Sequence, residues 1–128
     1  MAKIKTSELE GAALDWAVGS SLGMELRVSG YPDGEGGTEF TFAAKIPGGY
    51  KTYTPSTDWN QGGPLIEEYL ATATNGSWGG AAINASWVVT VIWKGAMTEC
   101  GPTFLVAACR AIVAAKLGDE VDVPEELL

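Results

Sequence analysis

The sequence contains no histidine. This absence excludes Ser-His-Asp and Cys-His catalysis, and it excludes every zinc site that needs an imidazole ligand. Acid–base chemistry would depend on Asp58, Glu67, Glu99 or on lysine and tyrosine side chains, and no pair of carboxylates stands out. We therefore expect a protein that is not an enzyme, has no catalytic residues, and binds neither a metal nor another cofactor.

Cysteine is nearly absent, with only Cys100 and Cys109 in the chain. If both lie on one helix, a spacing of nine residues places them on opposite sides, which argues against a disulfide between them. Cys100 could be a nucleophile only beside a group that lowers its pKa, and the sequence offers no such base nearby. We predict two unbonded thiols, with Cys109 buried and inert.

Basic residues are few: 8 lysines and arginines stand against 16 acids, for a net charge of −8. This balance disfavours general binding to nucleic acids, although it leaves room for a local anion site. No apolar run approaches the roughly 20 residues that cross a bilayer, and the N-terminus lacks a secretory signal. The sequence thus predicts a cytoplasmic protein that does not bind membranes, with a solvated acidic C-terminus.

What the sequence does contain is enough apolar residues, 46% of 128, for one domain over residues 1–128. Periodicity and capping residues predict the following elements: a helix over 7–18 with a Ser7–Glu10 capping box, strands over 24–29 and 39–46, a mobile connection between them, a short strand over 50–54, a helix begun by Pro64, a loop over 71–82, a strand over 85–94, and a helix over 102–117 that ends at Gly118.

The strand at 85–94 is apolar on both faces, which predicts a central position in a sheet. The helix at 102–117 is apolar almost all round, which predicts that most of it is buried. Alternating strands close in sequence suggest antiparallel pairs. Together these features indicate the α+β class, as a single compact domain with helices packed on a small, mainly antiparallel sheet.

A candidate site lies in "YTPSTDWNQGGPLIEEY", residues 53–69. In the functional interpretation, glycines and a helix begun by Pro64 offer N–H donors to an anion, and Trp59 stacks on a base. In the structural interpretation, which we favour from the residues alone, Trp59 fills the core and Asp58 caps a turn. The candidate residues are Ser56, Thr57, Asp58, Trp59, Gly62 and Gly63.

Arg110 interrupts the apolar surface of the last predicted helix. Such a guanidinium must reach water or find a carboxylate, and Asp58 and Glu67 are candidate partners. An ion pair that ties the loop to the helix is the favoured interpretation. The alternative is an arginine free to bind a phosphate or carboxylate of a ligand, beneath or beside the 56–64 loop.

Three tryptophans form a third feature. Trp87 and Trp93 share a strand face but stand about 20 Å apart, so they cannot enclose one base within a single chain. Trp78, in a glycine-rich segment, is a candidate for contact with a ligand or partner. The face formed by Trp87, Val89, Val91 and Trp93, and the last helix, each offer material for contact between subunits of a homo-oligomer.

Three blocks of the sequence, "LDWAV" at 14–18, residues 53–69, and "GPTFLVAACRAIVAAKLGDEVDVPEELL" at 101–128, resemble the NinX-like family of small proteins from tailed phages and prophages. The resemblance implies a phage accessory role in the bacterial cytoplasm, and it brings no catalytic residues. Two functions suit it. The first is a binder that sequesters a small, nucleotide-type ligand and so counteracts bacterial defence signalling. The alternative is an adaptor or inhibitor that binds a host or phage protein.

Overall fold

The computed structural model of the chain describes residues 2–75, 87–92 and 96–128. Trp78 and Trp93 lie outside these residues, so the expectations for them stay predictions. The elements in chain order are β1 (Ala2–Lys5), η1 (Thr6–Glu8), α1 (Gly11–Ser21), β2 (Leu26–Pro32), β3 (Thr38–Ile46), β4 (Gly49–Thr52), α2 (Trp59–Tyr69), β5 (Leu70–Asn75), β6 (Trp87–Ile92), β7 (Ala96–Gly101), α3 (Phe104–Leu117), β8 (Glu120–Val123) and η2 (Glu125–Leu127).

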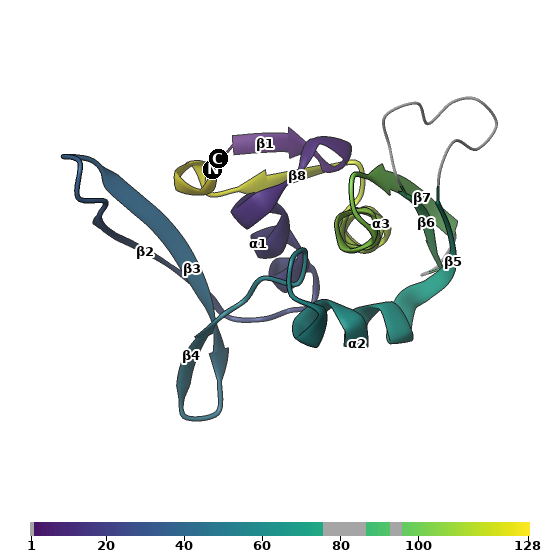
Figure 1. The fold of residues 1–128 in the computed structure, drawn as a ribbon, viewed down its shortest axis with the longest axis horizontal. Coiled ribbons are helices and arrows are strands. Elements are labelled where there is room, and N and C mark those ends of the chain that lie inside the picture. The colour runs from purple at the N-terminus through teal and green to yellow at the C-terminus, as the bar shows by residue number, and fades with distance from the viewer. Residues whose placement is uncertain (1, 76–86, 93–95) are drawn as a thin grey trace.

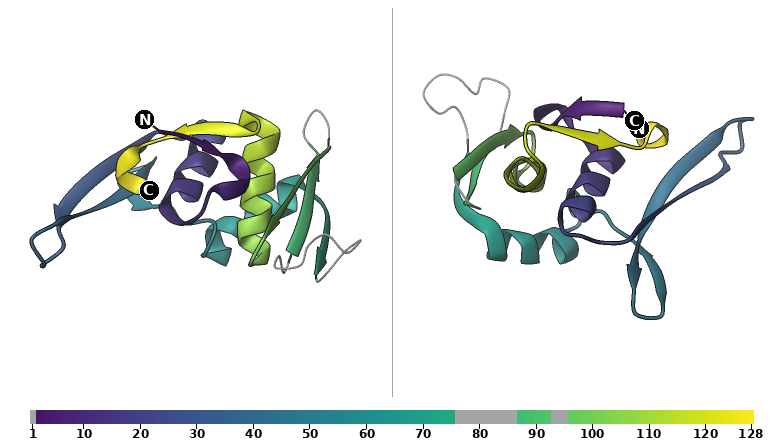
Figure 2. Two further views of the ribbon diagram at one scale, coloured as in Figure 1. Left: turned by 90° about the horizontal axis from the view of Figure 1, so that it is seen from above. Right: turned by 180° about the vertical axis from the view of Figure 1, so that it is seen from behind.

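The fold is α+β, and every strand pair described is antiparallel, as the sequence predicts. The strands form three small sheets rather than the one expected: β1-β8, β2-β3-β4 and β5-β6-β7. In Figure 1, α3 is seen end-on, with the β5-β6-β7 sheet on one side, α1 on the other and α2 below. The β2-β3-β4 sheet stands beyond α1 and projects from the body, which the views in Figure 2 confirm.

α3 is the centre of the core, as its apolarity predicts. The helix begins after Thr103, whose hydroxyl accepts a hydrogen bond from the N–H of Val106, and it ends at Gly118 with a φ of 93°. β6 lies between β5 and β7, so the prediction of a central strand is confirmed. Val89 and Val91 are buried in the core cluster and β6 packs on α3, whereas Trp87 is half-buried, so a subunit contact through this face or through α3 stays a prediction.

α1 begins later than predicted, at Gly11, and the Ser7–Glu10 capping box does not form. The cause is a contact distant in sequence. Thr6 is buried, its N–H donates to the Asp119 carbonyl over 2.7 Å, and its hydroxyl donates to the Gly118 carbonyl over 2.6 Å. These bonds hold residues 6–8 as a separate turn, and Gly11 takes a φ of 58° where the chain enters the helix.

Both ends of the chain form a two-stranded ribbon that the sequence analysis missed. β1 and β8 pair with Lys3 opposite Asp122 and Lys5 opposite Glu120, so opposite charges face each other across the strands. Val121 and Val123 alternate with these acids and are buried. The acids at this end, Asp119, Glu120, Asp122, Glu125 and Glu126, are exposed as expected, but the valines between them anchor β8 to the core.

Two predicted connections are also shorter than expected. β2 and β3 extend to Pro32 and Thr38, and the carboxylate of Asp33 accepts hydrogen bonds from the N–H groups of Glu35 and Gly37 over 2.7 and 3.1 Å. A turn with its own hydrogen bonds thus replaces the long mobile connection. β5 occupies part of the expected loop at 71–82, because its backbone pairs with β6; residues 76–82 lie outside the described chain.

Candidate functional site

The 53–58 segment is held in place from three directions. The buried carboxylate of Asp15 on α1 accepts a hydrogen bond from the backbone N–H of Ser56 over 2.8 Å. The side chain of Gln61 accepts from the N–H of Thr54 over 2.6 Å and donates to the Thr52 carbonyl over 2.9 Å. Pro55 is fully buried. These contacts make the segment a fixed wall rather than a free loop.

α2 begins at Trp59, so the predicted start at Pro64 is wrong and Pro64 lies inside the helix. The Asp58 carboxylate accepts from the N–H of Asn60 over 2.9 Å, and its carbonyl accepts from those of Gln61 and Gly62. Asp58 therefore occupies the end of α2 that was expected to bind an anion. The capping role in the structural interpretation is the one the molecule uses.

Gly62 and Gly63 have different surroundings. A Cβ on Gly62 would collide with the Pro55 carbonyl oxygen, whereas a Cβ on Gly63 would meet nothing within 4 Å. Gly62 thus permits the close approach of another backbone rather than of a ligand.

Trp59 is not a core residue, because 59% of its surface is exposed. It lies at the edge of a cavity of about 290 Å³, and its ring centroid is 5.7 Å from that of Phe104 at an interplanar angle of 42°. We call this cavity the Trp59 pocket. Its lining residues are Ser56, Thr57, Trp59, Thr103, Phe104, Leu105 and Val106.

The first turn of α3 forms the second wall of the Trp59 pocket, and the sequence analysis missed it. Thr103 caps the N–H of Val106, and the N–H of Ala107 donates to the Thr103 carbonyl over 3.0 Å. The N–H groups of Phe104 and Leu105 donate to no atom of the described residues. A helix N-terminus with two free donors thus belongs to the lining of the pocket, but it is that of α3 and not that of α2.

Ser56, in the lining of the Trp59 pocket, is hydrogen-bonded through its backbone N–H to Asp15. Both are 3% exposed. Burial raises the pKa of Asp15, and hydrogen bonding by Ser56 opposes that rise. The Ser56 hydroxyl oxygen is buried without a properly aligned hydrogen-bond partner among the described residues. Since Ser56 lines the pocket, this hydroxyl is, with the N–H groups of Phe104 and Leu105, a polar group there whose hydrogen bonds are incomplete.

Arg110 does not join this pocket. Its Nε donates to the Leu9 carbonyl over 2.8 Å and its Nη1 to the Cys100 carbonyl over 2.9 Å. Among the described residues it forms no ion pair with Asp58 or Glu67, so the predicted tie from the loop to the helix is wrong. The guanidinium instead bonds α3 to the residue that follows η1 and to the end of β7.

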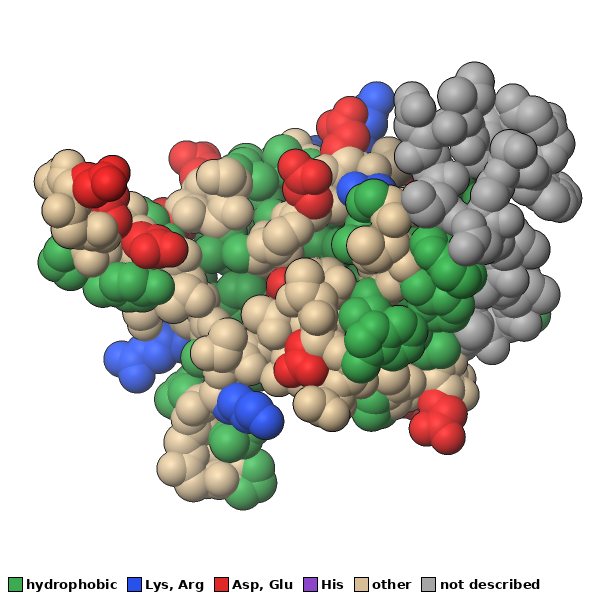
Figure 3. All heavy atoms as spheres, viewed as in Figure 1, with side chains coloured by type: hydrophobic (Ala, Val, Ile, Leu, Met, Phe, Trp, Pro, Cys, Tyr) green, Lys and Arg blue, Asp and Glu red, His purple; other side chains and the backbone are tan. Residues whose placement is uncertain are grey.

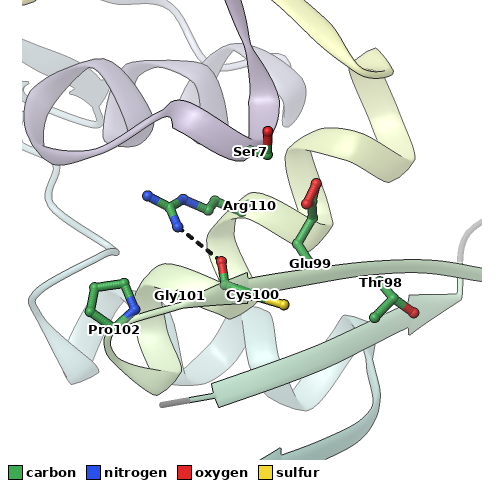
Figure 4. A pocket seen from close by; sticks show the side chains of 7 residues that line it. All are labelled: Ser7, Thr98, Glu99, Cys100, Gly101, Pro102 and Arg110. Carbon is green, nitrogen blue, oxygen red and sulfur yellow. Dashed lines mark hydrogen bonds between the residues drawn. The ribbon is translucent and has the colours of Figure 1, made fainter. Parts of the chain in front are cut away.

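Arg110 lines a separate cavity of about 380 Å³ together with Ser7, Thr98, Glu99, Cys100, Gly101 and Pro102. Figure 4 shows the Glu99 carboxylate pointing toward Ser7 and the Arg110 guanidinium bonded to the Cys100 carbonyl. Burial raises the pKa of Glu99, Arg110 lowers it in part, and Asp119 raises it. The residues that line this cavity come from η1, β7 and α3 and from the connection between the last two. The sequence does not show that these elements meet, so sequence reasoning could not find the cavity.

Cys100 and Cys109 are both free, Cys100 exposed on β7 and Cys109 buried on α3, so the prediction of unbonded thiols is confirmed. The two do not share a helix, as the argument from spacing had supposed. Burial raises the pKa of the Cys109 thiol. In the described ranges, no three acidic, cysteine or histidine side chains gather closely enough to hold a metal ion.

In the described part of the chain no helix is both long and apolar enough to cross a membrane. No curated protein matches the sequence. A family model described as "Bacteriophage P22, NinX" matches residues 5–116, which include α1, α2, the first turn of α3 and all residues that line the Trp59 pocket. The chain therefore belongs to the bacteriophage P22 NinX family.

Proposed function

We propose that this phage protein binds a small ligand of nucleotide type in the Trp59 pocket, in the cytoplasm of the bacterial host, and sequesters it without chemical change. The observation that carries this proposal is the exposed indole of Trp59 at the edge of a pocket whose other wall is the first turn of α3. An indole that stays 59% exposed contributes little to the core, and its face suits stacking on a flat ring.

The lining of the Trp59 pocket limits the class of ligand. None of the seven lining residues carries a charge, so an anionic group would be held by the N–H groups of Phe104 and Leu105 and by the helix dipole. The volume of about 290 Å³ lies at the lower end of the range for ligand pockets. These features favour a single nucleobase with at most one phosphate, such as a cyclic mononucleotide, over a polyphosphate.

Sequestration fits this lining better than catalysis does. Its hydroxyl groups belong to Ser56, Thr57 and Thr103, and no lysine, carboxylate or thiol lines the pocket to activate them. A binder without chemistry would withdraw a signalling nucleotide from solution, and a bacterial defence that depends on that nucleotide would then stay inactive. This is the sense in which we infer a role against host defence.

A second candidate, an adaptor or inhibitor of a host or phage protein, is favoured by a different observation. Five of the large hydrophobic residues that remain exposed belong to or adjoin the projecting β2-β3-β4 sheet: Met24, Tyr31, Phe40, Ile46 and Tyr50. Exposed aromatic and aliphatic side chains gathered on one element are typical of protein interfaces.

A thermal-shift screen with nucleosides and with mono- and cyclic nucleotides tests the first proposal. A ligand present at about 100 times its Kd adds about 2.7 kcal/mol of stability, which a melting curve detects. We expect Trp59→Ala to abolish the shift and Trp59→Phe to retain part of it. Tyr50→Ala, which removes another exposed aromatic ring from a different surface, is the control and should leave the shift intact. A screen with no stabilising nucleotide would contradict the proposal.

A further inference from the structure

The projecting β2-β3-β4 sheet has one face that nothing in the described chain covers. Phe42 and Ala44 point toward the body and are buried. The residues that alternate with them form the outer face, and none of these is buried: Arg27, Ser29, Tyr31, Glu39, Thr41, Ala43, Lys45, Tyr50 and Thr52. A small sheet usually needs a packed face for stability, and this one has only two buried apolar side chains, Phe42 and Ala44.

The two ends of the outer face carry opposite charges. At the hairpin end, Tyr31 lies opposite Glu39 across the strand pair. At the other end, Lys45 lies opposite Tyr50, and the Arg27 guanidinium lies 5.6 Å from the Tyr50 ring centroid. Each end therefore presents one exposed tyrosine, beside an acid at the hairpin end and, at the other end, beside two bases and the Glu25 carboxylate, which together leave a net charge of +1.

The charge of this sheet differs from that of the rest of the chain. Residues 24–52 contain four acids and three bases, a net charge of −1, while the remaining residues contain twelve acids and five bases, a net charge of −7. Figure 3 shows acidic side chains at the outer end of the β2-β3 hairpin and basic side chains toward β4. If a second copy of this face is turned end for end and laid on the first, the acidic end of each face meets the basic end of the other. Two copies of the face are therefore complementary in charge.

The middle of the outer face is flat. Ser29 and Thr41 lie opposite each other, and Ala43 follows on the same face of β3. These small side chains would let a second sheet approach to the spacing of about 10 Å that packed sheets adopt. The tyrosines near either end are rigid side chains of the kind enriched in interfaces.

We propose that the outer face of β2-β3-β4 docks on the same face of a second copy of this chain, related by a two-fold axis across the strands. This arrangement brings Glu39 and Tyr31 of one copy against Arg27, Lys45 and Tyr50 of the other, twice. Lys45 has a partner within its own chain, Glu25 at 3.4 Å, but both side chains are largely exposed and such pairs contribute little. A uniformly acidic or basic partner would match only one end of the face.

Charge reversal tests this interface. In analytical ultracentrifugation, wild type should dimerise in about 0.05 M salt and dissociate in about 0.5 M salt, because most of the attraction is between exposed charges. Glu39→Lys alone, and the double variant Arg27→Glu/Lys45→Glu, should each be monomeric, since both ends then carry the same sign. Glu68→Lys makes the same charge change on the exposed side of α2 and should dimerise like wild type.

Mixing the two monomeric variants is the decisive step. Glu39→Lys makes both ends of its face basic, and the double variant makes both ends acidic, so the mixture should form a one-to-one heterodimer at both contacts. Far-UV circular dichroism of each variant, matched to wild type, would show that neither failed simply by unfolding. A wild type that stays monomeric at the highest concentration reached in low salt, or folded variants that do not pair on mixing, would overturn the proposal.

Discussion

The backbone N–H of Ser56 donates to Oδ1 of Asp15 over 2.8 Å, although 41 residues separate the two in the chain. This bond joins α1 to the wall of the Trp59 pocket. Asp15 lies in the first of the three blocks that resemble the family, Ser56 lies in the second, and Thr103 to Val106 in the third form the facing wall. The three blocks, scattered in sequence, therefore meet around one cavity.

Asp15→Asn should stabilise the protein at neutral pH. Burial raises the folded-state pKa of Asp15 above its usual value of about 3.9, so the folded state binds this proton more tightly than the unfolded state. The free energy of unfolding then falls as pH rises from about 3.9 to the folded-state pKa. Asparagine keeps the oxygen that accepts from Ser56 but removes the charge. Urea denaturation at several pH values should show the advantage of the variant at pH 7 and its loss below about pH 3.9.

The control for this experiment is Asp15→Ala, which removes the acceptor as well as the charge. The buried N–H of Ser56 is then unsatisfied, at a cost of about 1–3 kcal/mol. An asparagine variant as unstable as the alanine variant would show that the charge of Asp15 is useful to the fold, contrary to our account.

Gly62→Ala and Gly63→Ala should change stability in opposite directions. Alanine favours a helix over glycine by about 1 kcal/mol at either site. At Gly62 the new Cβ would collide with the Pro55 carbonyl oxygen and with Leu105, whereas at Gly63 it meets nothing within 4 Å. We therefore expect Gly63→Ala to raise the free energy of unfolding and Gly62→Ala to lower it, both measured by chemical denaturation. Equal effects of the two substitutions would contradict this assignment.

Sequence reasoning succeeded where a local pattern decides the structure. The apolar run of α3 and the two apolar faces of β6 predict burial and a central strand, and both are observed. It failed where distant residues meet. Thr6 bonds to Gly118 and Asp119, and these bonds, which no local pattern reveals, displace the start of α1.

The candidate site was half predictable for the same reason. Ser56, Thr57 and Trp59 line the observed pocket, because an aromatic residue beside small polar ones marks a place where a ligand fits. Asp58, Gly62 and Arg110 have structural roles instead. The first turn of α3 supplies the other wall, and only the packing of α3 against the 53–58 segment brings that turn into the lining.

Cys100 and Cys109 should differ in their reaction with a thiol reagent. Cys100 is exposed, whereas Cys109 is buried and burial raises the pKa of its thiol, so little thiolate forms there in the folded protein. Iodoacetamide at pH 8 should modify one thiol per chain, which peptide mass spectrometry should assign to Cys100, and two thiols in denaturant. Rapid modification of Cys109 in the native protein would contradict the buried position of this face of α3.

Arg110 should contribute to stability and not to ligand binding. Its guanidinium donates hydrogen bonds to the carbonyls of Leu9 and Cys100. A hydrogen bond to a charged group contributes about 1.5–3 kcal/mol to the free energy of unfolding. Arg110→Ala should lose this stability, and Arg110→Lys should lose most of it. The single ammonium group of lysine cannot reach both carbonyls as the planar guanidinium does. Arg27→Ala, which removes an exposed arginine, should cost little in a dilute sample.

A double-mutant cycle between Arg110 and Asp58 separates this account from the ion pair that the sequence suggested. The two side chains share no hydrogen bond and no cavity lining, so the destabilisation by Arg110→Ala and by Asp58→Ala should add. An ion pair would instead make the double variant less destabilised than the sum of the singles. A coupling energy above about 0.5 kcal/mol in denaturation experiments would contradict this account. It would show that Asp58 and Arg110 interact, as the sequence suggested.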